Sequence, residues 1–215
     1  FFLNQIGKNV KTAFILNPTF SEVQLLESIV KDFGIDPKNK TKLGMVLELN
    51  NFLLNESNAG NNLVLIVDEA QNLKPALLEQ IRLLSNLETE KDKLLQVILV
   101  GQPELNSRIN LYDLRQLRQR IMVRYHIGPL DIDEIKGYIN WRMEIAGAGN
   151  KPEGNGLASD SQSHRAEGQK IEFSNEAVDI ISRFSGGTPR LINMICDRAL
   201  LAGFVSETAH IDFNI

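Results

Sequence analysis

Two adjacent carboxylates, Asp68 and Glu69, come directly after the unbroken apolar run LVLIV at positions 63–67. Such a run is typical of a strand buried on both faces, as in a parallel sheet covered by helices. Open sheets of this class bind ligands at the carboxyl ends of their strands. One carboxylate there can hold Mg²⁺, and its neighbour can orient a water for attack on a phosphate. The pattern favours phosphate chemistry; a buried strand that ends in two solvated acids is the alternative.

A polar side chain, Gln102, follows the next apolar run, LQVILV at positions 95–100. Because the ends of neighbouring parallel strands converge, an amide in this place can reach a γ-phosphate or the water that attacks it. The alternative is a glutamine that only stabilises the turn before Pro103.

A group of arginines precedes a strand that we predict at positions 123–127. They are Arg115, Arg118, Arg120 and Arg124. A helix end in this place lies at the edge of a domain, where an arginine can reach a nucleotide bound by a neighbouring subunit. A guanidinium supplied in that way stabilises the negative charge of a phosphoryl-transfer transition state. A solvated basic face is the alternative.

The stretch SGGTPRLIN at positions 185–193 predicts a helix start. Thr188 suits the N-cap and Pro189 the first helical position, which places Arg190 in the first turn. Backbone N–H groups and a guanidinium then point the same way and suit a phosphate. A capped helix with a surface arginine is the alternative.

The elements that must position these residues follow an α/β order. We predict strands at positions 11–16, 63–67, 95–100 and 123–127, separated by helices. Ser21 and Gln24 have the spacing of a capping box, and Pro75 suits a first helical turn. Strands that alternate with helices indicate a mainly parallel sheet.

From Asp131 onward the pattern predicts helices only. We therefore expect an α/β domain over residues 1–130 and a small helical domain over residues 131–215. Positions 147–169 are rich in Gly, Ser, Asn and charge and are expected to form a mobile loop.

Composition limits the class of protein. The 215 residues carry a net charge of −4, which argues against a broad nucleic-acid-binding surface. Ordinary hydrophobic and charged fractions of 43% and 23% indicate a globular protein. No apolar run is long enough to span a membrane. The single cysteine, Cys196, lies among apolar residues and is expected to be a core residue rather than a reactive thiol.

Several long motifs carry a resemblance to a known family. In chain order they are LVLIVDEAQNL, LEQIRLLSNLET, LLQVILVGQPEL, LRQLRQRIMVRYHIGPL and FSGGTPRLINMICDRALLAG. They resemble the AAA+ ATPases, and more closely the ATPase domain of the ExeA-like (general secretion pathway protein A) family of secretion and pilus-biogenesis ATPases. The resemblance covers nearly the whole chain apart from positions 147–169.

The resemblance implies a AAA+ module of the P-loop NTPase type, a parallel sheet flanked by helices with a helical lid, which uses ATP and Mg²⁺. It implies that Asp68 acts on Mg²⁺ and Glu69 polarises the attacking water. It places Gln102 at sensor 1 and Arg190 at sensor 2. Arg120 is the best candidate for the arginine finger, in competition with the other three arginines of its group.

The resemblance also implies partners and a location. We expect a homo-oligomer that associates through the edge carrying Arg120, and contacts with secretion or pilus-assembly proteins at the inner membrane. The domain is expected in the cytoplasm, in a protein anchored in the inner membrane. Two alternatives stay open: a DNA-associated ATPase of the transposition-helper type, and a non-enzymatic module for oligomerisation or interaction.

One motif of the family is absent from these residues. They contain no P-loop of the form GxxxxGK[ST]; the nearest sequence, at positions 5–9, has a Gly-Lys pair without the leading glycine and the hydroxyl residue. That loop supplies most of the grip on phosphate. We interpret the chain as starting inside the helix after the P-loop, so that the 215 residues alone are expected to be inactive. A natural protein without ATPase activity is the alternative.

Overall fold

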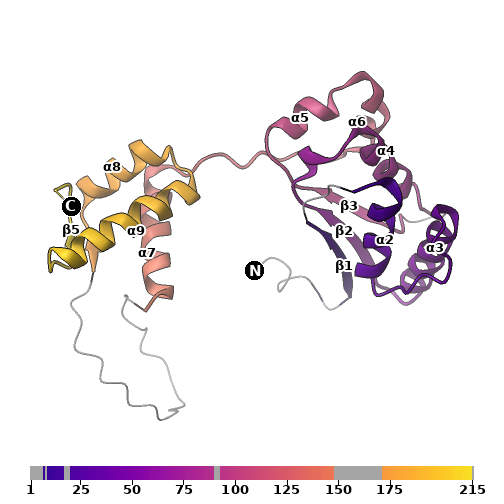
Figure 1. Cartoon of the computed structure of the whole chain (residues 1–215), viewed down its shortest axis with the longest axis horizontal. Coiled ribbons are helices and arrows are strands. Elements are labelled where there is room, and N and C mark those ends of the chain that lie inside the picture. Colours follow the sequence, from indigo (N-terminus) through magenta and orange to yellow (C-terminus); the bar gives the residue numbers. More distant parts are fainter. Residues whose placement is uncertain (1–6, 8, 17–19, 90–92, 148–170, 215) are drawn as a thin grey trace, which may run out of the picture. The chain divides into compact units, whose positions relative to one another are not determined.

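The structure is a computed structural model that describes residue 7 and residues 9–16, 20–89, 93–147 and 171–214. The chain forms two compact units, Phe1–Arg124 and Tyr125–Ile215 (Figure 1). The boundary expected near Leu130 and the role of a lid remain predictions.

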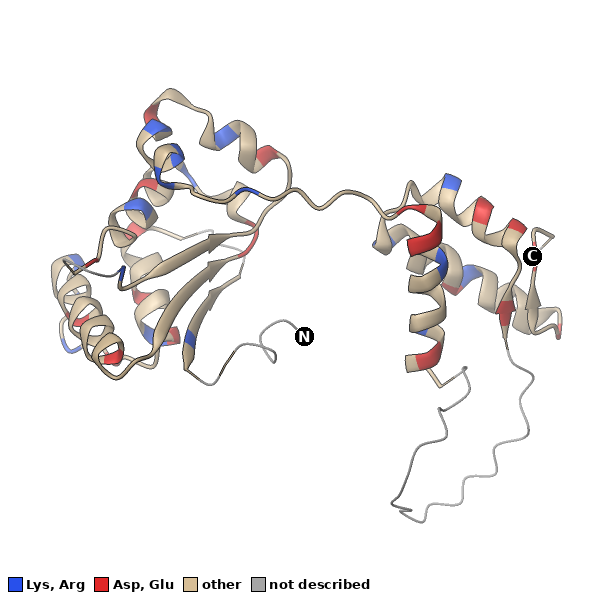
Figure 2. Cartoon of the chain, turned by 180° about the vertical axis from the view of Figure 1, so that it is seen from behind, with Lys and Arg blue, Asp and Glu red and all other residues tan. Residues whose placement is uncertain are grey.

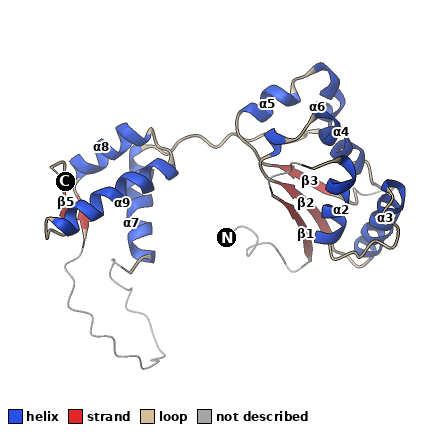
Figure 3. Cartoon of the chain, in the orientation of Figure 1, coloured by secondary structure: helices blue, strands red, loops and turns tan. Residues whose placement is uncertain are grey.

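The first unit is built on a parallel sheet. Its described strands are β1 (Val10–Ile15), β2 (Asn62–Val67) and β3 (Gln96–Leu99), in the order β1-β2-β3 (Figure 3). Thr12 pairs with Val64, which in turn pairs with Gln96. Strand β2 is therefore central, and its residues from Leu63 to Val67 are all buried. The parallel sheet and its buried central strand are confirmed.

Helices separate the strands, as the alternating pattern predicts. They are α2 (Glu22–Asp32), α3 (Lys42–Asn58), α4 (Pro75–Leu84), α5 (Glu104–Ile109) and α6 (Arg115–Arg120), with short 3₁₀ turns η1 (Ala70–Asn72) and η2 (Tyr112–Leu114). Helix α2 packs on β1 and α3 packs on β2. The capping box of Ser21 and Gln24 begins α2, and Pro75 is the first residue of α4. Both helix starts are confirmed.

Strand β3 is less buried than the apolar run at positions 95–100 suggests. Gln96 and Ile98 are exposed, Ile98 by 40%. The reason is its place in the sheet: β3 pairs with β2 along one edge, and no other strand of the described residues pairs with it. An edge strand shares fewer neighbours than a central one, so an apolar run cannot by itself indicate how deeply a strand is buried.

The strand predicted at positions 123–127 is not formed. The backbone there has no regular structure, and Val123, Tyr125 and Ile127 are more than 80% exposed. A strand exists only where its N–H and C=O groups pair with another strand. These residues have no such partner among the described parts of the chain, so their apolar character alone does not produce a strand.

The second unit is mainly helical. Helices α7 (Ile132–Ile145), α8 (Asn175–Ser185) and α9 (Pro189–Val205) enclose a core that contains Ile139, Ile181 and Ile192. The expectation of helices only is wrong in one respect: β4 (Glu172–Phe173) and β5 (His210–Ile211) form a parallel pair. Two-residue strands are too short to leave a periodic pattern in the sequence.

The loop expected at positions 147–169 lies almost wholly outside the described residues; only Gly147 falls within them. Among the described helices, none is both long and apolar enough to cross a bilayer.

Candidate functional site

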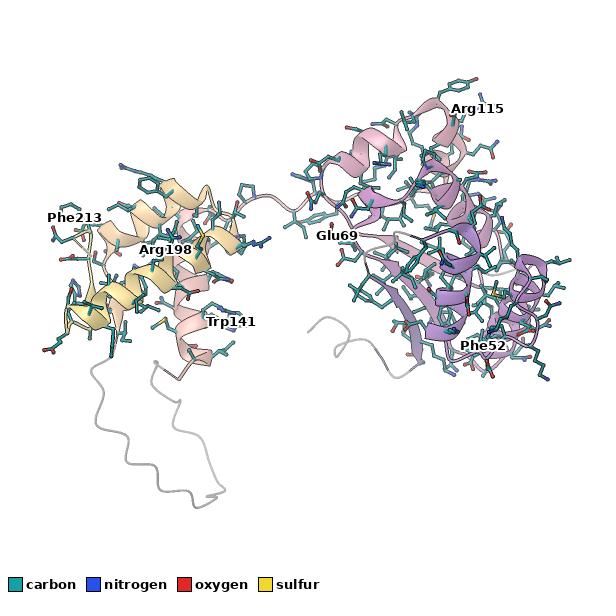
Figure 4. All side chains as sticks on the ribbon, in the orientation of Figure 1. Phe52, Glu69, Arg115, Trp141, Arg198 and Phe213 are labelled. Atoms are coloured by element: carbon teal, nitrogen blue, oxygen red, sulfur yellow. The ribbon has the colours of Figure 1, made fainter. Side chains whose placement is uncertain are left out.

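Backbone hydrogen bonds to both neighbouring strands hold the turn that carries the two acids. The backbone N–H of Asp68 donates to the carbonyl of Ile15 at the end of β1, at 2.9 Å. Two residues later, the N–H of Ala70 donates to the carbonyl of Val100 after β3, also at 2.9 Å. Glu69 lies between these two anchors, on the loop that follows β2 (Figure 4). Its backbone is therefore fixed relative to all three strands.

The backbone of Glu69 has a left-handed conformation, with φ 51° and ψ 35°. This region costs a residue other than glycine roughly 1–2 kcal/mol, and such strain is concentrated at functional sites. The sharp turn also brings the N–H of Glu69 to 2.8 Å from Oδ1 of Asp68. Both acidic residues are half-buried. The turn thus keeps the two carboxylates at the carboxyl end of the central strand.

A buried glutamine joins the acidic turn to the end of the next strand. Nε2 of Gln71 donates to Oε2 of Glu69 at 2.5 Å, and Oε1 of Gln71 accepts from the N–H of Gln102 at 3.0 Å. The expected convergence of Glu69 with the residue after β3 is therefore found, with the backbone of Gln102 in the contact. The side chain of Gln102 is exposed. Gln71 was not predicted as a site residue, although its place two residues after Glu69 was a usable signal.

The arginine group lies in and after helix α6 of the same unit. Arg120 is the last residue of α6, and its Nη1 is 4.0 Å from Oε2 of Glu88. It lines an open polar depression of about 500 Å³ together with Arg82, Arg115, Gln116 and Gln119. Arg115 contacts the ring and the hydroxyl of Tyr112. Figure 2 shows the Lys and Arg residues of this region in blue.

Arg190 belongs to the second unit, where it is exposed in the first turn of α9. Thr188 is the N-cap and Pro189 the first residue, as predicted, but the Thr188 side chain makes no capping hydrogen bond. The preceding glycine has a structural role. The carbonyl of Gly187 accepts from the N–H of Leu130 at 2.9 Å, and a Cβ on Gly187 would lie 2.2 Å from the Leu130 oxygen.

The described residues offer Mg²⁺ a partial set of ligands. No group of three or more His, Cys, Asp and Glu side chains gathers in these parts of the chain. Mg²⁺ is usually held by one or two carboxylates together with substrate phosphates and waters. The half-buried carboxylate of Asp68, at the end of the central strand, fits that donor set.

Cys196 was expected to be a core residue and is half-buried at the edge of the helical unit's core. It packs against the core of that unit. Burial raises the pKa of its thiol to about 11, and the charge of Asp197 acts in the same direction. Such a thiol is almost wholly protonated near neutral pH, so it is not a nucleophile.

Comparisons with known proteins agree with this architecture. Residues 2–109 match the family described as AAA domain. The chain is 41% identical over 203 residues to general secretion pathway protein A of Aeromonas hydrophila. The matched region covers 94% of this chain and 34% of that protein. The chain thus spans about a third of the length of this relative.

Solved structures show the same fold. Cdc6p of Pyrobaculum aerophilum is similar with a TM-score of 0.62 and 17% identity, over 94% of this chain and 50% of that one. A RuvB variant of Thermotoga maritima is similar with a TM-score of 0.50 and 14% identity, over 99% of this chain and 61% of that one. The fold is that of the AAA+ P-loop NTPases, as predicted. The chain belongs to the AAA domain family, in the group represented by general secretion pathway protein A.

Proposed function

We propose that this chain is the ATPase domain of a protein that couples ATP binding and hydrolysis to the assembly or operation of a cell-envelope secretion or pilus system. One observation carries the enzymatic part: Asp68 and Glu69 lie at the carboxyl end of the central parallel strand, in a turn anchored to both neighbouring strands. The similarity to general secretion pathway protein A supports the secretion role.

The two acids have different tasks in this proposal. Asp68 holds Mg²⁺, which neutralises charge on the phosphates of bound ATP. Glu69 accepts a hydrogen bond from the attacking water and orients it toward the γ-phosphate. Gln102, at the end of the neighbouring strand, contacts the γ-phosphate or that water. Because Gln71 occupies Oε2 of Glu69, the other carboxylate oxygen is available to the water.

Arg120 serves a neighbouring subunit in this proposal. It lies at the end of α6, beside a depression lined by three arginines. Glu88 lies 4.0 Å from it, and both side chains are more than a third exposed, so this ion pair is weak. Arg115, by contrast, is engaged by Tyr112. Arg120 is thus free to move toward the phosphates of a nucleotide across a homo-oligomeric interface.

Arg190 acts on the nucleotide of its own subunit as sensor 2. Its place in the first turn of α9 is the positive end of a helix dipole, a position that suits phosphate. The proposed location of the domain is the cytoplasm. Its proposed partners are other copies of the chain and secretion or pilus-assembly proteins at the inner membrane.

The test is ATP hydrolysis by the full-length protein with Glu69→Gln. Glutamine keeps the size of the side chain and loses the charge that polarises water, so turnover is expected to fall at least about 100-fold while ATP still binds. Glu27→Gln is a matched control, because it removes the same charge from a surface ion pair with Lys31 on α2. Turnover of Glu69→Gln within a few-fold of the unchanged protein would refute the assigned role.

A further inference from the structure

The side-chain amide of Gln71 is held by hydrogen bonds at both its nitrogen and its oxygen. It lies in η1 and is only 8% exposed. Its amide nitrogen donates to the Glu69 carboxylate and its amide oxygen accepts from the backbone of Gln102. A carboxylate can only accept and an N–H can only donate, so these two partners determine which way the amide points. Its donor and its acceptor each have a partner on a different loop.

The close approach of Gln71 also requires space beside Gln102. A Cβ on Gly101 would lie 2.7 Å from Oε1 of Gln71 and 3.3 Å from its backbone nitrogen. Any side chain at position 101 would therefore push the amide away from the N–H of Gln102. The glycine before Gln102 is explained by the presence of Gln71.

We propose that Gln71 is a positioning residue that holds the carboxylate of Glu69 and couples it to the loop that carries Gln102. This inference rests on the proposed function of Glu69. The side chain of Glu69 is half-buried and would otherwise sample several rotamers. A charge-assisted hydrogen bond from a buried amide restricts it to one of them.

The two hydrogen bonds of the Gln71 amide also couple the movements of the Gln102 backbone and the Glu69 carboxylate. When Gln102 contacts a γ-phosphate or its attacking water, any displacement of its backbone moves the oxygen of Gln71. The nitrogen of the same rigid amide then moves the carboxylate of Glu69. Occupancy at the end of β3 is in this way linked to the orientation of Glu69 at the end of β2.

The first test compares two buried glutamines of the same unit in the full-length protein. Gln71→Met keeps the volume and removes both hydrogen bonds. It is expected to lower kcat by about 10–100-fold, because small misplacements of a catalytic group are costly, and to leave KM within about threefold. Gln80→Met is the matched control: Gln80 is 3% exposed and donates to the carbonyl of Glu22, away from the acids.

Gln80→Met is expected to keep kcat within about twofold. If Gln71→Met also keeps kcat while Glu69→Gln loses it, the positioning role is wrong and the proposed function stands. In the Gln71→Met background, Glu69→Gln is expected to lower kcat by a smaller factor than it does in the unchanged protein, because both changes act on the same carboxylate.

A second measurement needs no ATP and tests the bridge itself. In the ¹⁵N-labelled protein, Glu69→Gln is expected to shift the backbone amide resonance of Gln102 when Gln71 is present. In the Gln71→Met background the same change is expected to leave that resonance in place. An equal shift in both backgrounds, or none in either, would overturn the coupling whether or not the protein hydrolyses ATP.

Discussion

Replacing Gly187 by alanine is expected to destabilise the second unit by about 3 kcal/mol. Two costs add. Gly187 has φ +74°, a left-handed conformation that costs an alanine about 1–2 kcal/mol. The new Cβ would also lie 2.2 Å from the carbonyl oxygen of Leu130 and 2.8 Å from its nitrogen, and overpacking of this kind costs about 1–3 kcal/mol. Lower entropy of the unfolded chain offsets about 0.4–1 kcal/mol of the sum.

The neighbouring glycine provides the control. Gly186 also has a positive φ, +53°, but a Cβ there meets no atom within 4 Å. Gly186→Ala therefore carries the conformational cost without the clash, and its net effect is expected to be about 1 kcal/mol. The difference between the two variants isolates the close approach of Leu130.

The assay is urea unfolding followed by tryptophan fluorescence. The chain has one tryptophan, Trp141, which lies on α7 beside Tyr138, so the signal reports the second unit alone (Figure 4). With an m value of about 1–3 kcal/mol per M, the difference of about 2 kcal/mol should lower the urea midpoint of Gly187→Ala by about 0.7–2 M more than that of Gly186→Ala. Equal midpoints for the two variants would show that the Leu130 backbone does not contact Gly187, and the reasoning would fail.

Three further outcomes are expected. Arg120→Ala in the full-length protein should bind ATP and lose turnover. Mixing this variant with Glu69→Gln should restore ATP hydrolysis, because some interfaces of the mixed oligomer pair an intact Arg120 with an intact Glu69. If the two variants co-assemble and no mixing ratio restores hydrolysis, Arg120 does not act on the neighbouring subunit. Cys196 should react with a thiol reagent at pH 8 far more slowly in the folded protein than in urea, because its pKa of about 11 leaves little thiolate; equal rates would contradict its burial. Ser21→Ala should cost about 1 kcal/mol in chemical unfolding, because its hydroxyl accepts from the N–H of Gln24, whereas Ser21→Asn, which can still cap, should cost much less.

Much of the fold was predictable because its signals are local. The apolar run that ends at Asp68 predicted a strand buried on both faces, because such a strand can carry five apolar residues in a row without exposing them. The capping box at Ser21 and the proline at position 75 predicted helix starts within a residue, because caps depend on neighbours three or four positions away.

The errors share a different cause. Positions 123–127 have the composition of a strand but lack a partner among the described residues, and Ile98 is exposed because β3 is an edge strand there. The pair β4–β5 was missed because its strands, near Phe173 and Ile211, are distant in sequence and two residues long. Pairing between distant segments leaves no trace in a local pattern.

For the candidate site, too, some features were predictable from the sequence and others depend on contacts between distant segments. The sequence by itself determined that Asp68 and Glu69 follow a buried strand, that Gln102 follows the next strand, and that both belong to motifs that resemble AAA+ ATPases. Only the tertiary structure decided that Gln71 joins Glu69 to the backbone of Gln102, and that Gly101 leaves room for it. The residue type determines which groups can donate or accept a hydrogen bond. Whether the bond forms depends on the distance and direction between the two groups. In this site the pairing of the parallel strands in register sets that geometry.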